Sequence, residues 1–549
     1  MNIRFYSVKS RLFFLVCFYL CSSVFICDSV SAAPPTLTHF FPAGVQQGKS
    51  VEVVANGTFA RWPVQAWTDR KGVEIKPAKD KGKLTVAVAA DAVPGVCWIR
   101  LHDEEGASEL RSFLIGTLPE TMEKEPNDEA TKPQTLAALP VVVNGRLEKA
   151  GDVDCFAVRL RKSETLVASL EANHTLESPM DAILQLLSTD GFVMEENNDD
   201  RGLDPQIVFT APKEGVYVLR TFAFPAQPDA SIRFAGGATY IYRLTLTTGG
   251  FADHAFPLAV QRSDSATVEA VGWNIPAAAK KLPLKPDVLG PLTLWHPQLA
   301  NTLPVVVEPH RCLGEVESND RKNPQLITLP ATISGRIDPP GDLDVYQFEA
   351  KKGQRLAFHL DARSADSQLD PLLRLTDAAG KRLAQTSDTK AGKPGAGVAV
   401  LAFTVPGDGP YRLEVSDEKE HGGWRHFYRL RATLAEPDYA LTLTADRFTL
   451  TLGKPLAIPI TIDRRNGFDR AIEISVEGLP DGVTAKAVQS TGAAGKSATL
   501  NLEAKHGPMS AAIRVVGRAS GQTDFTRTAT APRIKLPQTT PYLWLTVTK

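Results

Sequence analysis

The sequence predicts an all-β protein made of tandem β-sandwich domains, immunoglobulin-like and jelly-roll-like. Three observations lead to this fold class. Apolar and polar residues alternate with a period of two, and Asn-Gly, Asp-Gly and Pro-Gly turns separate the alternating runs. Turn formers are abundant, with 40 Gly and 39 Pro against 5 Met. A long segment also occurs twice, which indicates repeated domains.

The length and the charge limit the classes of protein that the chain can belong to. A chain of 549 residues exceeds one core and should hold roughly three to five domains of about 100–200 residues. Lys and Arg total 61 and Asp and Glu total 62, so the net charge is −1. This balance gives no electrostatic basis for binding nucleic acid or an anionic membrane.

Residues 1–32 have the pattern of a secretory signal peptide. Three basic residues precede an apolar run over 12–27, and small residues follow at 30–32. The alternative, a membrane anchor, is disfavoured because the run is shorter than the ~20 residues of a span and ends at Asp28. After removal of this segment no transmembrane stretch remains. We therefore expect a secreted protein: extracellular, periplasmic or on the cell surface.

The cysteines outside the signal predict neither disulfides nor a zinc site. Cys97, Cys155 and Cys312 are odd in number and widely spaced. Cys155 stands where an apolar strand residue would fit, so we expect it to be a buried small hydrophobe.

Residues 33–118 read as the first β-sandwich. "SVEVVANGTF" (50–59) gives a strand and an Asn-Gly turn, and "KLTVAVAADAVPGVCWIRLHD" (83–103) gives two alternating runs split by Pro-Gly. The opening "PTLTHFFPAGVQQGKSVEVVANGTF" (35–59) resembles the TIG/IPT immunoglobulin-like family, which implies a fold but no site.

The repeat occupies residues 119–249 and 314–435, which we call the first and second repeats. "NGRLEKAGDVDCFAVRL" (144–160) parallels "SGRIDPPGDLDVYQFEA" (334–350), and "EGVYVLR" (214–220) parallels "DGPYRLE" (408–414). Each repeat has an acidic hexapeptide near its start, "EKEPND" (123–128) or "EVESND" (315–320). The turn-separated alternation predicts an antiparallel sandwich in both repeats.

These motifs, in this order, resemble the bacterial pre-peptidase C-terminal domain family. That family includes the collagen-binding modules of secreted clostridial collagenases. The resemblance implies β-sandwich modules that are appended to secreted enzymes or strung together in surface proteins and are not themselves catalytic.

Two further segments complete the chain. We expect residues 250–313, with a Pro-rich stretch, to form an immunoglobulin-like connector. Residues 436–549 are dense in Thr, Val, Ile and Leu at period two. They resemble the immunoglobulin- or fibronectin-type modules of bacterial surface proteins, with "RRNGFDRAIEISVEGLPDGV" (464–483) carrying the resemblance.

The hexapeptides are candidate calcium ligands. Calcium takes six to eight oxygen ligands, and alternate residues of an extended segment share a face. In the family, the ligands come from this lead-in together with acidic residues of the next strand region. Carried over by motif, the predicted metal-binding residues are Glu123, Glu125, Asn127, Asp128, Asp152, Asp154, Glu315, Glu317, Asn319, Asp320, Asp342 and Asp344.

A plainer role for these residues stays open. Asp and Asn side chains often cap turns by accepting bonds from nearby backbone N–H groups. In each Gly-Asp-x-Asp motif, either aspartate could be the one that binds the ion, or neither.

Other features of the sequence favour structural roles for its polar and aromatic residues over catalytic ones. The sequence contains no nucleophile elbow, zinc-protease motif, phosphate loop or dinucleotide Gly pattern. "HGGW" (421–424) fits a polar turn, and we expect His421 and His426 to be incidental. Trp62 and Trp67 near a turn, with Tyr542 and Trp544 on one strand face, could form a ligand platform or pack in a core.

We therefore expect a secreted, non-catalytic binding or scaffolding protein of the bacterial envelope or exterior. It would recognise protein or polysaccharide through its sandwich modules, with structural calcium and no cofactor beyond it. The alternative is an accessory subunit or tail module of a secreted peptidase or glycoside hydrolase.

Overall fold

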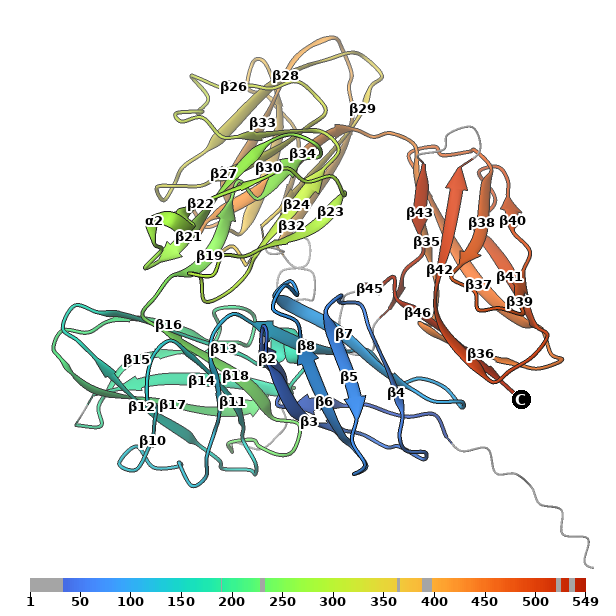
Figure 1. The fold of residues 1–549 in the computed structure, drawn as a ribbon. Helices are drawn as coiled ribbons and strands as arrows, with labels where there is room; N and C mark the ends of the chain where they lie inside the picture. Colours follow the sequence, from blue (N-terminus) through green and yellow to red (C-terminus); the bar gives the residue numbers. More distant parts are fainter. Residues whose placement is uncertain are drawn as a thin grey trace, which may run out of the picture. The chain divides into compact units, whose positions relative to one another are not determined.

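A computed structural model shows the chain as a succession of two-layered sandwiches (Figure 1). The structure describes residues 33–188, 190–227, 233–362, 366–387, 397–519, 525–532 and 539–549, so the predicted signal peptide lies outside the described residues. Within these ranges the two helices, α1 (Asn173–Leu176) and α2 (Ala277–Lys280), have one turn each. The prediction of an all-β, multidomain β-sandwich protein is confirmed.

The first sandwich consists of two four-stranded sheets around one core. Their strand orders are β1-β3-β6-β5 and β2-β8-β7-β4. Residues Val53 and Ala55 on one strand and Leu84 and Val86 on the next are buried at every second position, as period-two alternation requires. The strands are β1 (His39–Phe41), β2 (Gly44–Gln46), β3 (Ser50–Asn56), β4 (Gln65–Thr68), β5 (Val73–Pro77), β6 (Lys83–Val88), β7 (Gly95–His102) and β8 (Arg111–Gly116).

The first repeat folds into two five-stranded sheets, ordered β10-β12-β17-β14-β15 and β16-β13-β18-β11-β9. Its strands are β9 (Glu120–Met122), β10 (Gln134–Thr135), β11 (Val141–Arg146), β12 (Asp154–Leu160), β13 (Thr165–Glu171), β14 (Met180–Leu187), β15 (Val193–Asn197), β16 (Gln206–Thr210), β17 (Gly215–Pro225) and β18 (Ile241–Thr247).

The second repeat has the same strand order, β26-β28-β33-β30-β31 and β25-β27-β34-β29-β32. Its strands are β25 (Arg311–Gly314), β26 (Gln325–Leu326), β27 (Ala331–Arg336), β28 (Asp344–Ala350), β29 (Arg355–Asp361), β30 (Pro371–Asp377), β31 (Arg382–Ser387), β32 (Val398–Thr404), β33 (Gly409–Asp417) and β34 (Phe427–Leu434). The register is also shared, because Gly145 lies opposite Tyr242 and Gly335 lies opposite Tyr428. Equivalent residues of the two repeats therefore occupy equivalent places.

Residues 251–308 form a small sandwich of two three-stranded sheets, ordered β19-β21-β22 and β20-β24-β23. Ala252, Val268 and Val305 are among its buried residues. The strands are β19 (Phe251–Phe256), β20 (Ala259–Gln261), β21 (Ala266–Trp273), β22 (Lys281–Leu284), β23 (Gly290–Leu294) and β24 (Leu303–Glu308).

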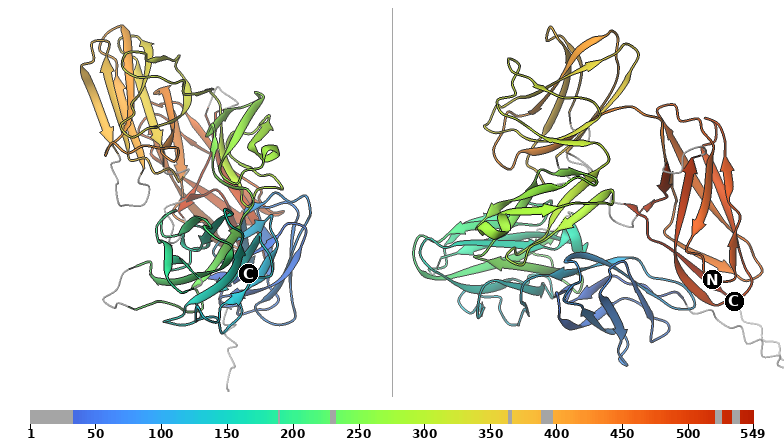
Figure 2. Two further views of the ribbon diagram at one scale, coloured as in Figure 1. Left: turned by 90° about the vertical axis from the view of Figure 1, so that its left-hand side faces the viewer. Right: turned by 45° about the horizontal axis from the view of Figure 1, so that its top comes forward.

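The last sandwich places a four-stranded sheet, β35-β37-β41-β39, over a larger one, β36-β46-β42-β38-β40 (Figure 2). Tyr439, Ile460 and Leu545 are part of their common core. The strands are β35 (Asp438–Thr442), β36 (Arg447–Thr451), β37 (Leu456–Arg465), β38 (Ile472–Glu477), β39 (Val483–Ala485), β40 (Val488–Ser490), β41 (Ser497–Ala504), β42 (Met509–Ala519), β43 (Thr526–Thr528), β44 (Ala531–Pro532), β45 (Thr539–Thr540) and β46 (Leu543–Thr548).

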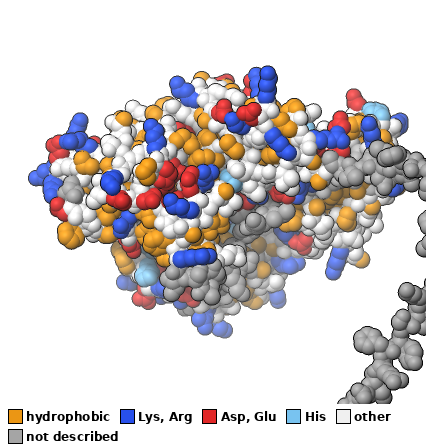
Figure 3. All heavy atoms as spheres, turned by 90° about the horizontal axis from the view of Figure 1, so that it is seen from below, with side chains coloured by type: hydrophobic (Ala, Val, Ile, Leu, Met, Phe, Trp, Pro, Cys, Tyr) orange, Lys and Arg blue, Asp and Glu red, His pale blue; other side chains and the backbone are white. Residues whose placement is uncertain are grey.

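One face of the protein carries both signs of charge side by side. On the face drawn in Figure 3, Lys and Arg side chains are interspersed with Asp and Glu. Among the described residues, no helix has both the length and the apolar character needed to cross a bilayer. Cys97, Cys155 and Cys312 are free thiols, and Cys155 is fully buried.

Candidate metal centres

Each acidic hexapeptide crosses from one sheet of its repeat to the other. Residues 123–128 lie between β9, which pairs with β11, and β10, which pairs with β12. Backbone bonds hold the crossing at both ends: Glu123 N donates to Asn144 O (3.0 Å), and Cys155 N donates to Asn127 O (3.0 Å). In the second repeat, Glu315 N donates to Ser334 O (3.0 Å), and Val345 N donates to Asn319 O (2.6 Å). The acidic side chains are thus placed where the two layers meet.

A buried tyrosine anchors the acidic group in the first repeat. The Tyr242 hydroxyl donates to Asp154 Oδ2 (2.6 Å) and to Glu123 Oε2 (3.2 Å). Glu123 Oε2 also accepts a bond from Arg146 N (2.7 Å). Gly145 makes this approach sterically feasible, because a Cβ there would overlap the Tyr242 ring and lie 2.6 Å from Glu123 Oε2.

The second repeat keeps this arrangement and adds one hydroxyl. Tyr428 donates to Asp344 Oδ2 (2.5 Å), and Arg336 N donates to Glu315 Oε2 (2.5 Å). Tyr346, which stands where the first repeat has Phe156, places its hydroxyl 2.6 Å from that of Tyr428. The two sites therefore share a tyrosine–carboxylate contact, but the hydrogen-bond network of the second site contains one more tyrosine hydroxyl.

Carboxylate oxygens converge beside each tyrosine. In the first repeat, oxygens of Glu125, Asp128 and Asp152 all lie within 4.8 Å of one another. In the second repeat the converging set is Glu315, Glu317 and Asp344, of which only Glu317 is the counterpart of a member of the first set, Glu125. Oxygens on opposite sides of a calcium ion are about 4.6–5.2 Å apart, twice the 2.3–2.6 Å bond length. The spacing therefore fits a calcium coordination shell.

Buried amides supply the strongest indication that a cation belongs here. Asn127 and Asn319 are each 1% exposed, and neither the oxygen nor the nitrogen of either side chain has a hydrogen-bond partner. One oxygen each of Asp152, Asp154 and Asp344 is likewise buried without a hydrogen bond. Buried polar atoms are rarely left unsatisfied, so these atoms call for a partner that the hydrogen bonds of the chain do not supply.

Without a cation, burial raises the pKa of the inner carboxyl groups. Burial, opposed by hydrogen bonds, raises the pKa of Glu123 to about 7, and burial also raises that of Glu315 to about 7. Burial and the neighbouring glutamate raise the pKa of Asp154 and of Asp344 to about 9. Burial also raises the pKa of Glu125, Asp152 and Glu317. Clustered carboxylates repel one another, and a bound cation would remove that repulsion.

Some predicted ligands cap turns instead, as the plainer alternative allowed. Asp320 Oδ1 accepts bonds from Lys322 N (2.7 Å) and Asn323 N (2.9 Å). Asp342 accepts from Leu343 N (2.8 Å) and Asp338 N (3.0 Å). Asp152 combines both roles, since Oδ2 accepts from Glu148 N while Oδ1 has no hydrogen bond. The structure brings Asp128 to its cluster but leaves Asp320 in a turn.

Sequence reasoning missed the tyrosines. Tyr242 and Tyr428 align in the repeat, and this alignment alone predicts a packing role. The missing signal was their register opposite Gly145 and Gly335, which points each hydroxyl at a carboxylate.

The aromatic residues considered for a ligand platform pack against one another. Trp67 lies 5.4 Å from Tyr542 and 6.2 Å from Trp544, between ring centroids, and so joins the first and last sandwiches. Trp62 donates its indole N–H to Ala78 O (2.8 Å) and packs on Phe59. The core alternative therefore describes them better than an exposed platform.

Comparison with known proteins found similarity to solved structures. No protein-family model matches the chain, and no curated protein matches it. The pre-peptidase C-terminal domain of a Bacillus anthracis collagenase aligns over 20% of this chain and 93% of its own, at 19% identity and a TM-score of 0.16. The Escherichia coli alpha-2-macroglobulin aligns over 94% of this chain and 47% of its own, at 11% identity and a TM-score of 0.14. The insect immune protein hemolin aligns over 91% and 100%, at 11% identity and a TM-score of 0.20. The fold described above rests on the strand pairing of this chain.

Proposed function

We propose that this chain is a secreted, non-catalytic binding or scaffolding protein whose two repeats are each clipped by a structural calcium ion. The observation that carries the proposal is the pair of buried, unsatisfied amides of Asn127 and Asn319, which stand in the same hexapeptides as the converging carboxylates. The donors are all oxygen, which suits a hard cation and disfavours zinc or copper.

The ion would cross-link the two layers of each repeat. Glu125, Asn127 and Asp128 belong to the crossing segment, whereas Asp152 belongs to the loop before β12. A cation held by both groups ties the segment to the sandwich and offsets the repulsion among the acids. We propose a structural role because the ion would join the crossing segment to the sandwich.

Such a site supports export. Oxygen-only modules of extracellular proteins bind calcium at about 10⁻⁴–10⁻³ M, which suits calcium levels outside the cell. The sequence pattern of residues 1–32 favours the same location. We therefore propose that the protein acts outside the cytoplasm, at the envelope or beyond it.

The calcium proposal can be tested by titrating the chelator-treated chain and following its thermal unfolding. We expect two binding events and an upward shift of the melting transition. Asn127→Ala and Asn319→Ala should each remove one event, because each deletes a buried oxygen donor. Glu129→Gln is the matched control, since Glu129 pairs with Lys132 (3.3 Å) instead of joining the cluster. Absence of any calcium-dependent shift in the wild-type chain would refute both sites.

For the binding function we propose a protein or polysaccharide partner outside the cell. Three consecutive apolar residues at the start of β15 are exposed, Phe192 (73% exposed) just before the strand and Val193 (47%) and Met194 (37%) within it, which supports a contact surface. Matrix-protein and glycan arrays probed with wild-type chain and with Phe192→Ser should show a signal that the variant loses. Stoichiometric capture of a secreted peptidase or glycoside hydrolase, with no array signal, would instead favour an accessory subunit.

A further inference from the structure

A second kind of donor cluster lies in the second repeat, at the end of β33 and in the loop that follows it. Ligand atoms of Asp417, His421 and His426 all lie within 4.8 Å of one another. His421 Nδ1 is 3.9 Å from Asp417 Oδ1, and the two imidazole rings are 6.5 Å apart between centroids. None of these residues belongs to the acidic cluster built around Glu315.

Backbone N–H groups hold the Asp417 carboxylate in place and leave part of its capacity to accept bonds unused. Asp417 Oδ1 accepts bonds from Lys419 N (2.9 Å) and His421 N (3.0 Å), and Oδ2 accepts from Asp370 N (2.8 Å). A carboxylate has about four lone-pair sites, so one remains for a metal. His426 N donates to Gly423 O (2.8 Å), which fixes the start of β34.

A second, independent observation points to a ligand. Nδ1 of His426 is buried and has no hydrogen-bond partner. A buried imidazole nitrogen normally finds one. One ring nitrogen of His426 lies within 4.8 Å of donor atoms of Asp417 and His421, and the exposed His421 side chain can rotate to close the distance.

The first repeat shows that the sandwich does not need this triad. Where β33 has Asp417, the aligned position of β17 is Ala223, and the position aligned with His426 is Tyr240. The same fold forms without the three donors, so their convergence is specific to the second repeat.

We propose that Asp417, His421 and His426 form a site for a borderline divalent transition metal, with zinc as the expected ion. Two imidazoles and one carboxylate are the donor types of zinc sites, and three protein ligands leave a fourth position for water or an external ligand. Calcium, which selects oxygen donors, should not compete.

Closure of this site would also fix an inter-domain contact. Trp424 and Arg425 lie between the two histidines in sequence. Trp424 packs on Trp273 (5.3 Å between centroids), and Arg425 pairs with Asp200 (3.0 Å) and Asp253 (2.9 Å). A metal that joins His421 to His426 would therefore hold the loop that links the second repeat to the small sandwich and the first repeat.

Cobalt is the probe that tests the proposal. The untagged, chelator-treated chain is titrated with Co²⁺, whose visible d–d absorption reports ligand type and geometry. We expect one equivalent to bind, Zn²⁺ to displace it, and Ca²⁺ to leave it in place. His421→Ala and His426→Ala should each weaken Co²⁺ binding by at least about tenfold, because even outer-shell changes cost 10- to 100-fold in metal affinity.

Two controls separate ligand loss from misfolding and from surface binding. His506→Ala removes another exposed histidine, in the last sandwich, and should bind Co²⁺ like the wild type. Because His421 is exposed, His421→Ala should keep the wild-type melting temperature in chelator. The proposal is overturned if the wild type shows no d–d absorption, if the His421 and His426 variants bind as it does, or if His506→Ala loses as much affinity.

Discussion

At the scale of single residues, one tyrosine hydroxyl in each repeat donates a hydrogen bond to a buried aspartate, Asp154 or Asp344. In the second repeat, Tyr428 stands between Asp344 and Tyr346 and is the donor to the carboxylate. Tyr346 reaches the carboxylate only through Tyr428, and the first repeat replaces it with Phe156. The two tyrosines should therefore differ in energetic importance although both are fully buried.

Removing these hydroxyls one at a time tests that ranking. Tyr428→Phe leaves Asp344 and Tyr346 without their buried partner, so we expect a loss of about 1–3 kcal/mol in the free energy of unfolding. Tyr346→Phe recreates the first repeat and keeps the bond to Asp344, so we expect less than about 1 kcal/mol. Urea unfolding of both variants in chelator measures the difference. Equal losses would show that the hydroxyl pair acts as one unit.

A buried histidine in β1 makes stability depend on pH. Burial and the nearby Arg146 and Arg111 lower the pKa of His39 from 6.5 to about 4. Below pH 6.5 the unfolded chain binds a proton at His39 that the folded chain does not bind. The contribution of His39 to the free energy of unfolding is therefore complete above pH 6.5. It is lost at up to about 1.4 kcal/mol per pH unit as the pH falls toward 4.

Unfolding measured from pH 7 to pH 4 checks this expectation. His39→Gln should lose less stability across that window than the wild type, because it lacks the titrating ring. His506→Gln, which removes an exposed histidine, should follow the wild-type curve. Parallel curves for the wild type and His39→Gln would contradict the assignment.

At the scale of elements, the register of β11 with β18, and of β27 with β34, creates each site. Gly145 and Gly335 are the strand positions over which the tyrosine rings pass. A Cβ at Gly335 would overlap the Tyr428 ring and lie 2.8 Å from Glu315 Oε2. An alanine there must push aside both the ring and the carboxylate.

Alanine substitutions at these glycines should cost about 1–3 kcal/mol in the free energy of unfolding, the usual price of overpacking. They should also weaken the calcium-dependent melting shift of their own repeat only. Gly314→Ala is the matched strand control, because a Cβ at Gly314 meets no atom within 4 Å. Thermal unfolding with and without calcium measures both effects. A wild-type shift in Gly145→Ala and Gly335→Ala would separate the tyrosine contact from the cation site.

The elements were largely predictable from sequence, whereas their lateral contacts were not. Alternation marks strands because a sheet buries every second side chain, as Leu84 and Val86 show. The sequence repeat identified the acidic hexapeptides, because the alignment of the two copies places Glu123 opposite Glu315. The tyrosine–carboxylate contacts needed cross-strand register, and the packing of Trp67 on Trp544 joins strands from opposite ends of the chain. Local sequence patterns carry neither kind of information.

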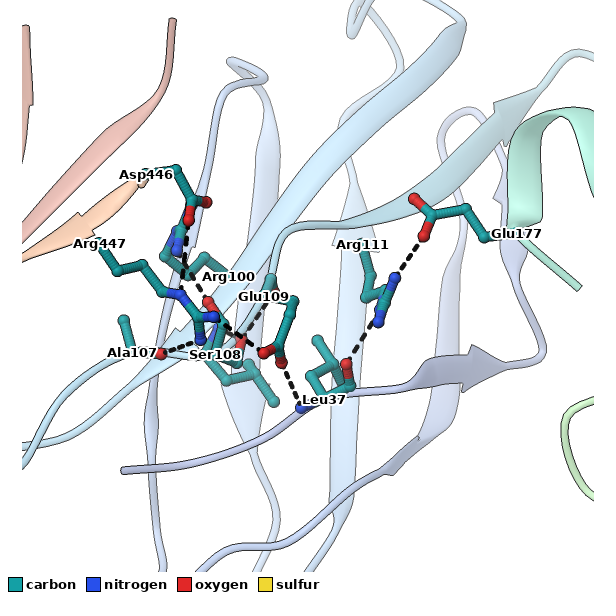
Figure 4. Close-up of polar contacts among 10 residues, drawn as sticks. Leu37, Arg100, Ala107, Ser108, Glu109, Arg111, Glu177, Asp446 and Arg447 are labelled. Carbon is teal, nitrogen blue, oxygen red and sulfur yellow. Dashed lines mark hydrogen bonds and ion pairs between the residues drawn. The ribbon is translucent and has the colours of Figure 1, made fainter. Parts of the chain in front are cut away.

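At the scale of the whole molecule, arginines link sandwiches that are distant in sequence (Figure 4). Arg100 of the first sandwich is 1% exposed and pairs with Asp446 of the last (2.6 Å). Beside it, Arg447 pairs with Glu109 (2.9 Å), and Arg111 contacts Glu177 of the first repeat (2.5 Å). These pairs are more buried than an ordinary surface ion pair, so each should contribute to the coupling of its two domains.

The Arg100–Asp446 pair gives the sharpest test of that coupling. Asp446→Ala leaves a buried guanidinium with only carbonyl partners, Ser108 O (2.8 Å) and Tyr542 O (3.4 Å), and should cost about 3–5 kcal/mol. We expect the last sandwich then to unfold in a separate, earlier calorimetric transition.

Asp80→Ala, which breaks the exposed Lys83–Asp80 pair (3.0 Å), should leave the profile unchanged. The double variant Arg100→Met/Asp446→Leu removes the unpaired charge and should recover most of the loss, because apolar replacement of a buried ion pair is often neutral. If Asp446→Ala melts like the wild type, the ion pair does not couple the two ends of the chain, and the aromatic contacts of Trp67 must do so alone.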